Sequence, residues 1–309
     1  MTFAAALLLA MLVTPAKPER LIAITFDDLP MVSATQVPVE VFEALTRQLV
    51  GSIVLHRVPA IGFVNEGKLY DTDGDADPRR VGLLEQWLGA GLSLGNHTWS
   101  HPDLHRMALV EFERDLLRGE TVTRALLLAQ GKPLRFFRHP FLHTGQPLAV
   151  RDSLLVFLDQ HGYEVAPVTI DNSDYLFARA YDLARSRGDS ILATRLATTY
   201  LDYMESVVVF YEGQADAIIG HAFPQVLLLH ASALNAHTFD ALATRLTTRG
   251  YHFVSLELAL RDPAYQNQDR YAGNAGISWL QRWAITRGML GSTFLGEPEV
   301  PDWVEAAAR

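Results

Sequence analysis

The stretch of sequence that decides the fold is Leu21-Ile22-Ala23-Ile24-Thr25-Phe26, which Asp27-Asp28 follow at once. This run is almost entirely apolar and predicts a buried strand. Parallel strands deliver their functional groups at their carboxyl ends, so the two aspartates are candidates for a site. The adjacent carboxylates repel each other, and a cation bound by one of them would remove this difficulty. A solvated turn is the alternative, since Asp-Asp before Leu29-Pro30 is favourable turn chemistry.

Short apolar runs alternate with longer helical patterns along the rest of the chain. The expected strands cover residues 21–26, 60–64, 92–95, 134–137, 163–169, 226–229 and 252–255. The expected helices cover residues 39–58, 79–90, 109–130, 148–161, 177–211 and 238–249. Seven strands that alternate in order with six helices imply parallel strands joined by right-handed crossovers. The sequence therefore predicts an α/β barrel, complete or incomplete, rather than a sandwich or a helix bundle.

The composition limits the possible partners and ligands. The chain has 309 residues, 49% of them hydrophobic, which suits one large α/β domain or two small ones. It has no cysteine, so disulfides and thiolate ligands are excluded, and any metal must be held by nitrogen and oxygen. The net charge is −9 and there is no basic run, which argues against nucleic acid as a partner. Neutral polymers or small neutral amides fit this charge better.

Residues 262–309 depart from the alternating pattern. They contain three prolines, several glycines and three of the five tryptophans, Trp279, Trp283 and Trp303. We interpret this stretch as a C-terminal extension packed on the barrel, with one short helix near residues 277–286. The tryptophans could instead line a groove or form a partner surface.

The N-terminus carries the pattern of an export signal. Residues 3–13 form an unbroken apolar or small run, followed by Thr14-Pro15-Ala16 and Lys17. Such a run is too short to span a bilayer but fits the core of a signal peptide. We expect residues 1–16 to be a signal peptide and the mature chain to be periplasmic or secreted, with no membrane-spanning segment. No Lys or Arg precedes the run, so a buried N-terminal helix or a misassigned start remains an alternative.

Polar residues gather where the expected strands end. The third strand is followed by residues 96–101, the fourth by 138–141, the fifth by 171–175 and the sixth by His230. In a closed barrel these ends meet on one rim. Carboxylates, imidazoles and a guanidinium from distant parts of the sequence would therefore converge. Their shared position at strand ends indicates a functional site more specifically than any one of these residues does.

His97 and His101 are four residues apart, so on a helical turn both imidazoles would lie on one face and could share a metal. Two histidines and one carboxylate leave open positions for water, the pattern of a hydrolytic zinc site. One strand-end aspartate would bind the metal while the other takes a proton from bound water. Two unrelated polar histidines at a helix start are the alternative.

Arg138 and His230 would complete such a site. Arg138 would lie beside the aspartates and fix the orientation and ionisation of one of them, unless it forms a surface ion pair. His230 follows Val226-Leu227-Leu228-Leu229, a strand with little polar character, and Leu228 shares its face. A capped core histidine is the alternative.

These five segments resemble, in the same order, the motifs of the polysaccharide deacetylase family, also called the NodB homology domain or carbohydrate esterase family four. The resemblance runs from residue 21 to residue 260. Thr25-Phe26-Asp27-Asp28 is similar to the first motif, which implies that Asp27 is the general base and Asp28 a metal ligand. His97-Thr98-Trp99-Ser100-His101 is similar to the second motif, which supplies both histidine ligands.

The third and fourth motifs imply supporting and substrate-binding residues. Phe137-Arg138-His139-Pro140-Phe141 is similar to the third, whose arginine, Arg138, supports the base and whose aromatic residue, Phe141, offers a backbone N–H to the oxyanion. Residues 171–175 resemble the fourth, in which Asp174 would orient the catalytic histidine. Tyr175 stands there where a tryptophan is usual and would contact the substrate.

The fifth motif, residues 227–230, implies a groove leucine at Leu228 and the catalytic acid at His230. The long segment 176–225 and the stretch after Asp262 lie outside the motifs, and both bear on the substrate rather than on the chemistry. His105 and His143 are further candidates for the groove. A lone histidine near a site is more often structural, so these two stay outside the catalytic set.

The resemblance implies a distorted, incomplete (β/α)7 barrel over residues 20–261 and an extension over residues 262–309. It also implies a hydrolase that uses a divalent metal ion, Zn²⁺ first and Co²⁺ or Ni²⁺ as alternatives, to remove N-acetyl or O-acetyl groups from a carbohydrate. A hydrolase of a linear or cyclic non-sugar amide would use the same site. A non-catalytic sugar-binding module is a third hypothesis. The sequence fixes neither the acetylated substrate nor the oligomeric state.

Overall fold

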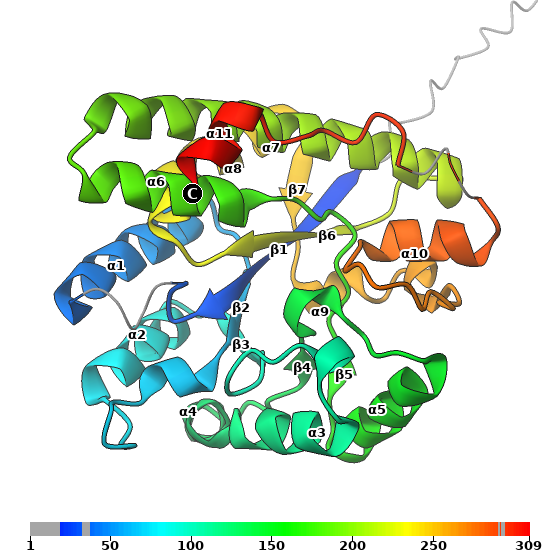
Figure 1. The fold of residues 1–309 in the computed structure, drawn as a ribbon, viewed down its shortest axis with the longest axis horizontal. Coiled ribbons are helices and arrows are strands. Elements are labelled where there is room, and N and C mark those ends of the chain that lie inside the picture. The colour runs from blue at the N-terminus through cyan, green and yellow to red at the C-terminus, as the bar shows by residue number, and fades with distance from the viewer. Residues whose placement is uncertain (1–18, 33–37, 290, 292–293) are drawn as a thin grey trace, which may run out of the picture.

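A parallel sheet of seven strands forms the centre of the protein, and helices surround it (Figure 1). The computed structural model describes residues 19–32, 38–289, 291 and 294–309. The strands are β1 (Arg20–Leu29), β2 (Ile61–Val64), β3 (Ser93–Asn96), β4 (Phe136–Phe137), β5 (Glu164–Val165), β6 (Gln225–His230) and β7 (Tyr251–Phe253). The expected signal peptide, residues 1–16, lies outside the described residues.

The strands follow the order β5-β4-β3-β2-β1-β6, and β7 pairs with the first residues of β1. After β5 the chain returns to the other edge of the sheet, where Ile170 forms a bridge with Leu227 of β6. The sheet therefore curls toward closure without a continuous ladder of hydrogen bonds around the ring. The predicted fold class, an incomplete α/β barrel of parallel strands, is confirmed.

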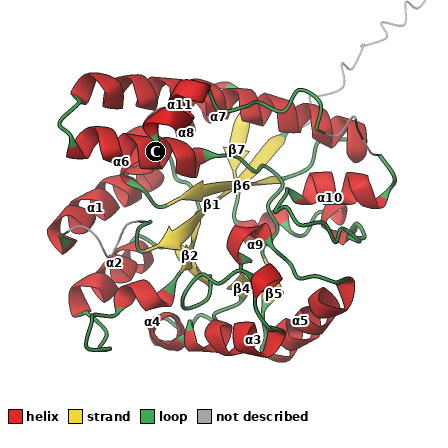
Figure 2. Cartoon of the chain, viewed as in Figure 1, coloured by secondary structure: helices red, strands yellow, loops and turns green. Residues whose placement is uncertain are grey.

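Helices cover the outside of the sheet, as the separation of helix and strand in Figure 2 shows. They are α1 (Val39–Leu55), α2 (Pro78–Gly89), α3 (Leu109–Arg118), α4 (Thr121–Ala129), α5 (Leu148–Gln160), α6 (Asp174–Ser186), α7 (Ser190–Ile218), α8 (Ala233–Thr248), α9 (Leu256–Ala259), α10 (Trp279–Thr286) and α11 (Asp302–Ala307). Short 3-10 helices lie at η1 (Glu66–Leu69), η2 (Leu104–Arg106), η3 (Pro140–Leu142) and η4 (Pro263–Gln266). Among the described helices, none is both long and apolar enough to cross a membrane.

The alternation of side chains along β1 points its functional groups into the half-barrel. Phe26 faces the outer helices and packs edge-on against the rings of Trp87 and Phe239. Ala23 faces the other way, into a small apolar cluster with residues of β2 and β6. Thr25 and Asp27 follow Ala23 at intervals of two, so they share its inward direction.

The helix predicted over residues 109–130 is in fact two helices, α3 and α4, separated at Gly119 and Glu120. At this point the backbone of Thr98 and Trp99 lies directly against the helix end. A Cβ on Gly119 would be 2.4 Å from the carbonyl carbon of Thr98. The Trp99 N–H also donates to the Asp115 carbonyl. A contact between distant segments therefore overrides the local helical pattern.

Three other predicted boundaries were also wrong. The long helix expected over residues 177–211 divides into α6 and α7, because Gly188 has a φ of +70° and the Asp189 side chain caps the N-terminus of α7. The strand expected over residues 163–169 shortens to β5, since Pro167 cannot donate to the ladder. α8 begins at Ala233, five residues before the expected start at Thr238, because Ser232 caps it.

The C-terminal residues pack on the outside of the barrel. Trp279 and Trp283 are buried, and the Trp283 ring lies 6.3 Å from the ring of Phe223, which precedes β6. Trp303 is half-buried, with the guanidinium carbon of Arg195 4.0 Å from its ring centroid. α11 packs against α6 (Figure 1). The three tryptophans of this stretch thus contribute to packing, and α10 matches the expected short helix.

We expect Gly119→Ala to destabilise the protein by about 1–3 kcal/mol, because the new methyl group would overlap with the backbone of Thr98 and Trp99. Gly89→Ala is the matched control, since no atom lies within 4 Å of a Cβ at this helical position. The control should be neutral or stabilising by up to about 1 kcal/mol. Urea unfolding measures both changes, and equal effects of the two substitutions would contradict the packing described.

Candidate metal centre

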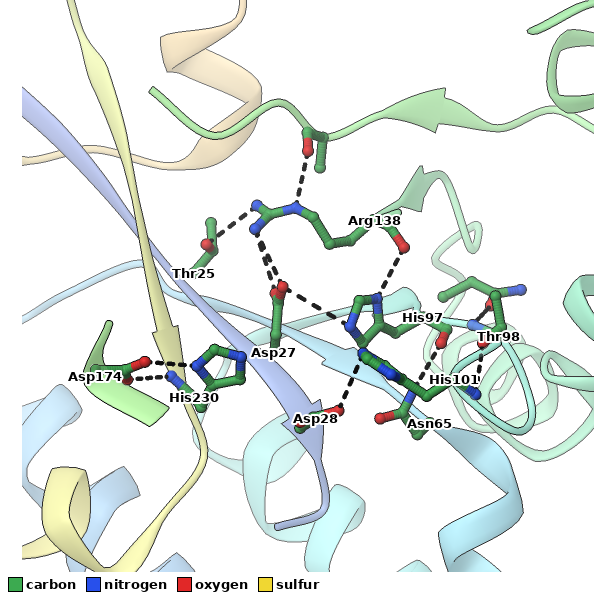
Figure 3. A network of polar contacts seen from close by, with 12 residues as sticks. Thr25, Asp27, Asp28, Asn65, His97, Thr98, His101, Arg138, Asp174 and His230 are labelled. Atoms are coloured by element: carbon green, nitrogen blue, oxygen red, sulfur yellow. Dashed lines mark hydrogen bonds and ion pairs between the residues drawn. The ribbon is translucent and has the colours of Figure 1, made fainter. Parts of the chain in front are cut away.

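Asp28, His97 and His101, hereafter the Asp–His–His cluster, lie together at the carboxyl rim of the sheet (Figure 3). Their candidate ligand atoms all lie within 4.8 Å of one another. The distance from His101 Nε2 to Asp28 Oδ1 is 3.9 Å. Asp28 turns out of β1 with a φ of +69°, a left-handed conformation that is unfavourable for a residue with a side chain.

The backbone between the two histidines is a loop, so the predicted helical turn was wrong. Thr98 and His101 both have positive φ, at 69° and 57°. Side chains take the place of helical hydrogen bonds. Asn96 accepts from the Thr98 N–H, and Thr98 accepts from the His101 N–H. The loop still brings the two imidazoles together, with ring centroids 4.9 Å apart.

The protonation of His97 suits metal binding. Its Nδ1 lies 2.8 Å from the Arg138 carbonyl oxygen, which can only accept, so Nδ1 carries the proton. Nε2 therefore directs a lone pair toward the cluster, the usual orientation of a metal-binding histidine. Burial and the neighbouring His101 hold the pKa of His97 well below its ordinary value. Two neutral imidazoles and one carboxylate fit a divalent transition-metal ion.

Lys68 is a residue near this cluster that the sequence analysis missed. Its ammonium lies 3.2 Å from Asp28 Oδ1 and donates to the Asp28 carbonyl. Burial would raise the pKa of Asp28, but Lys68 and His101 outweigh it and hold that pKa well below its usual range. The carboxylate is therefore ionised and ready to bind a cation. No local pattern links Lys68 to Asp28, because η1 brings it there only in the folded chain.

Asp27 is paired with a fully buried arginine. Arg138 has 0% exposure, and its Nη1 lies 3.3 and 3.4 Å from the two carboxylate oxygens of Asp27. The same guanidinium donates to Thr25 Oγ1 and to the Ala166 carbonyl. Burial raises the pKa of Asp27 to about 6, although the charge of Arg138 opposes this shift. Asp27 Oδ2 is also 3.8 Å from His97 Nε2, at the edge of the cluster.

His230 and Asp174 form a second pair at the same rim. His230 Nδ1 lies 2.6 Å from Asp174 Oδ1, and the His230 backbone N–H donates to Asp174 Oδ2. Burial lowers the pKa of His230, but the Asp174 carboxylate outweighs it, and the net pKa is about 9. Asn235 donates to Asp174 Oδ2, and the Tyr200 hydroxyl donates to Asn235. The sequence motifs did not indicate that residues of α7 and α8 would hold Asp174 in place.

The three expected substrate-binding residues differ in accessibility. Phe141 is 52% exposed, and its ring lies 4.5 Å from that of His101. Tyr175 is 51% exposed, with its ring 6.3 Å from that of His230. Leu228 is only 5% exposed, so it offers a ligand little surface. The two aromatic side chains therefore border the rim, whereas Leu228 mainly packs in the core.

A second group, Asp103, His105 and His143, also has ligand atoms within 4.8 Å of one another. Its two imidazole rings are stacked, with centroids 4.0 Å apart and planes 7° from parallel. A metal ion binds in the plane of an imidazole ring, and one ion cannot lie in two parallel, separated planes. His143 Nδ1 instead lies 2.7 Å from Asp103 Oδ1. We interpret this group as a structural part of the rim.

The fold and this site together define a class: an α/β half-barrel with a candidate metal centre and two acid–base pairs at its carboxyl rim. The model of the family described as polysaccharide deacetylase matches residues 14–166. The chain belongs to the polysaccharide deacetylase family, as its five motifs had indicated.

Two curated relatives illustrate the similarity. The chain is 23% identical over 245 residues to peptidoglycan-N-acetylglucosamine deacetylase PgdA of Listeria monocytogenes, a match that covers 79% of this chain and 40% of PgdA. It is 27% identical over 167 residues to a chitin deacetylase of Pestalotiopsis sp, covering 53% of this chain and 46% of that protein. The chain thus spans less than half the length of either relative.

Among solved structures, peptidoglycan deacetylase PdaC from Bacillus subtilis is similar, with 20% identity and a TM-score of 0.48. The superposition covers 80% of this chain and 95% of that one.

We expect Asp174→Asn to lower the pKa of His230 from about 9, because a neutral amide no longer favours the imidazolium. The fall should be at least about one pH unit. An NMR titration of the His230 ring in metal-free protein measures it. Asp202→Asn, at an exposed ion pair with Arg245, is the control and should change nothing. An unchanged pKa of His230 in a folded Asp174→Asn protein would rule out this pairing.

Proposed function

We propose that this chain is a metal-dependent hydrolase that removes N-acetyl groups, or O-acetyl groups, from a carbohydrate. The observation that carries the proposal is the combination at one rim of the Asp–His–His cluster with two differently tuned acid–base pairs. Asp27 has the properties of a base and His230 those of an acid, and each has its own charged partner. Divergent pKa values within one site are typical of acid–base catalysis.

The Asp–His–His cluster would hold the metal ion. Its nitrogen and oxygen donors suit Zn²⁺, with Co²⁺ and Ni²⁺ as the alternatives. When bound, such an ion lowers the pKa of a coordinated water from about 15.7 toward about 7 and polarises a carbonyl group. Lys68 would help to keep the Asp28 carboxylate in place, because its ammonium lies 3.2 Å from Asp28 Oδ1.

Asp27 would accept the proton of the attacking water. With a pKa of about 6, its carboxylate is mostly ionised at neutral pH and still basic enough to take a proton. Arg138 contacts both carboxylate oxygens and so fixes their orientation. His97 Nε2 is 3.8 Å from Asp27 Oδ2, which puts the base within reach of a water bound at the cluster.

His230 would protonate the leaving nitrogen or oxygen. Its pKa of about 9 keeps it protonated at neutral pH, so it can donate as the carbon–nitrogen bond breaks. Asp174 would hold the ring in place and stabilise its charge. Within the described residues, the backbone N–H of Phe141 makes no hydrogen bond, so it is free to donate to the developing oxyanion.

The exposed rings of Phe141 and Tyr175 support a carbohydrate as the substrate. Aromatic side chains of this kind offer flat apolar faces beside polar groups, and sugars present both surfaces. The names of the two curated relatives, a peptidoglycan-N-acetylglucosamine deacetylase and a chitin deacetylase, support the same class. A linear or cyclic non-sugar amide would suit the same chemistry, and a substrate assay separates the two possibilities.

We expect Asp27→Asn to retain the metal but lose activity by roughly 100-fold or more, because the amide cannot accept the water's proton. His97→Ala should lose both metal and activity, since it removes a ligand. Elemental analysis measures the metal. Acetate release from chitooligosaccharides, peptidoglycan fragments and simple amides measures activity.

Asp202→Asn and His221→Ala, at exposed positions, are the matched controls and should keep both metal and activity. Full turnover in a folded Asp27→Asn protein would show that another group is the base. Sugar binding without acetate release from any compound would favour a non-catalytic binding module.

We also propose that the chain is exported, on the strength of its apolar N-terminal residues. Expression in a bacterial host with a secretion pathway should yield a secreted or periplasmic product that begins at Lys17. Mass spectrometry of the intact product measures this, and replacing Leu8 with Arg should keep the chain in the cytoplasm, because a charge interrupts the apolar core of the signal. An uncleaved cytoplasmic product from the unaltered gene would contradict export.

A further inference from the structure

The C-terminal extension contacts the loop that carries Phe141. Gly276 lies so close to this loop that a Cβ there would be 1.8 Å from the Phe141 carbonyl oxygen and 3.3 Å from the Leu142 Cβ. Gln146, just after the loop, donates to the Gly273 carbonyl. Two segments that are far apart in the sequence therefore pack backbone against backbone beside the candidate site.

Arg282 of α10 fastens this contact. Its side chain is buried, with 1% exposure, and its Nε donates to Asp269 Oδ2 at 2.8 Å. Nη2 donates to the Thr144 hydroxyl, and Nη1 lies 3.5 Å from the Leu142 carbonyl oxygen. The guanidinium thus joins the extension to Leu142 and Thr144, which follow Phe141, and would resist movement of the turn at Phe141.

Aromatic rings enclose the same guanidinium. Its central carbon lies 4.9 Å from the ring centroid of Trp279 and 5.1 Å from that of Tyr271. An arginine held by two rings, a carboxylate, a hydroxyl and a backbone carbonyl has little freedom to move. Arg282 is therefore suited to fix the position of a neighbouring loop.

The loop needs such a restraint. Phe141 and Leu142 have φ values of 57° and 54°, a left-handed conformation that bulky residues avoid. Such a conformation persists only where the surrounding contacts impose it. It also determines the direction of the Phe141 N–H, the group that would face the oxyanion.

Resting on the proposed function, we propose that Arg282 is a positioning residue for the reaction. Through Thr144 and the Leu142 carbonyl it holds the 139–144 loop in the conformation that directs the Phe141 N–H toward the substrate. Arg282 touches neither substrate nor metal in this role. The family match ends at residue 166, so this contribution comes from a part of the chain outside it.

Kinetics of Arg282→Met and Thr144→Val test the proposal. Each substitution should lower kcat roughly 10- to 100-fold, since a small misplacement of a catalytic group has effects of this size. KM and bound metal should change little. The double variant should be no worse than the more impaired single variant, because both act through one contact. Arg282→Lys should recover part of kcat, since one donor remains.

Gly276→Ala is an independent variant that pushes on the loop without removing any hydrogen bond. It should lower kcat in the same way, whereas Gly213→Ala, with no atom within 4 Å of its Cβ, is the matched control and should not. Additive losses in the double variant, or an unchanged kcat in folded Arg282→Met and Thr144→Val proteins, would overturn the proposal.

Hydrogen–deuterium exchange separates this inference from the proposed function, because it needs no substrate. Arg282→Met should speed exchange at the amides of residues 141–145 and leave those of α1 unchanged. Unchanged exchange in the loop would overturn the positioning role even if the enzyme is a deacetylase. If the parent chain releases acetate from no compound, the proposed function fails and the catalytic part of this inference fails with it.

Discussion

The buried ion pair between Arg138 and Asp27 is the interaction on which the rest of the site depends. Arg138 has no exposed surface, so every part of its charge must be balanced inside the protein. Its guanidinium bonds to side chains of β1 and to the Ala166 carbonyl just after β5. One residue therefore joins β1 to the segment after the edge strand β5, and its charge lowers the pKa of the candidate base against the effect of burial. Breaking such a pair by removing one partner costs about 3–5 kcal/mol.

The strands and the residues at their ends could be predicted because burial and alternation are local properties of the sequence. The conformation of the connecting loops could not, because it depends on distant partners. The segment from His97 to His101 has the spacing of a helical turn, yet Asp115 of α3 binds the N–H groups of Trp99 and Ser100 and holds it as a loop. Lys68 could not be predicted as a neighbour of the cluster for the same reason, because only the folded chain brings its ammonium to Asp28.

The two segments outside the family motifs, residues 176–225 and the stretch after Asp262, both support residues of the rim through hydrogen bonds. Tyr200, on the long helix α7, reaches Asp174 through Asn235. Arg282, in the C-terminal extension, reaches the loop that carries Phe141. These two regions, which the sequence linked to the substrate rather than to the chemistry, thus support residues on two sides of the candidate site. Neither contact has a sequence signature, because each depends on one buried polar side chain among many apolar ones.

The rim residues with a left-handed backbone conformation limit the substitutions that the proposed site can tolerate. Of the six non-glycine residues with positive φ in the described chain, five lie at the rim: Thr98 and His101 in one loop, Phe141 and Leu142 in the other, and Asp28 near the end of β1. Glycine would relieve the strain at each position, but it would delete a candidate ligand, an aromatic face, a hydroxyl that shapes the loop or a buried leucine side chain. Selection of variants for heat resistance alone would therefore favour glycine at these positions, and the proposed activity would be lost with the side chains.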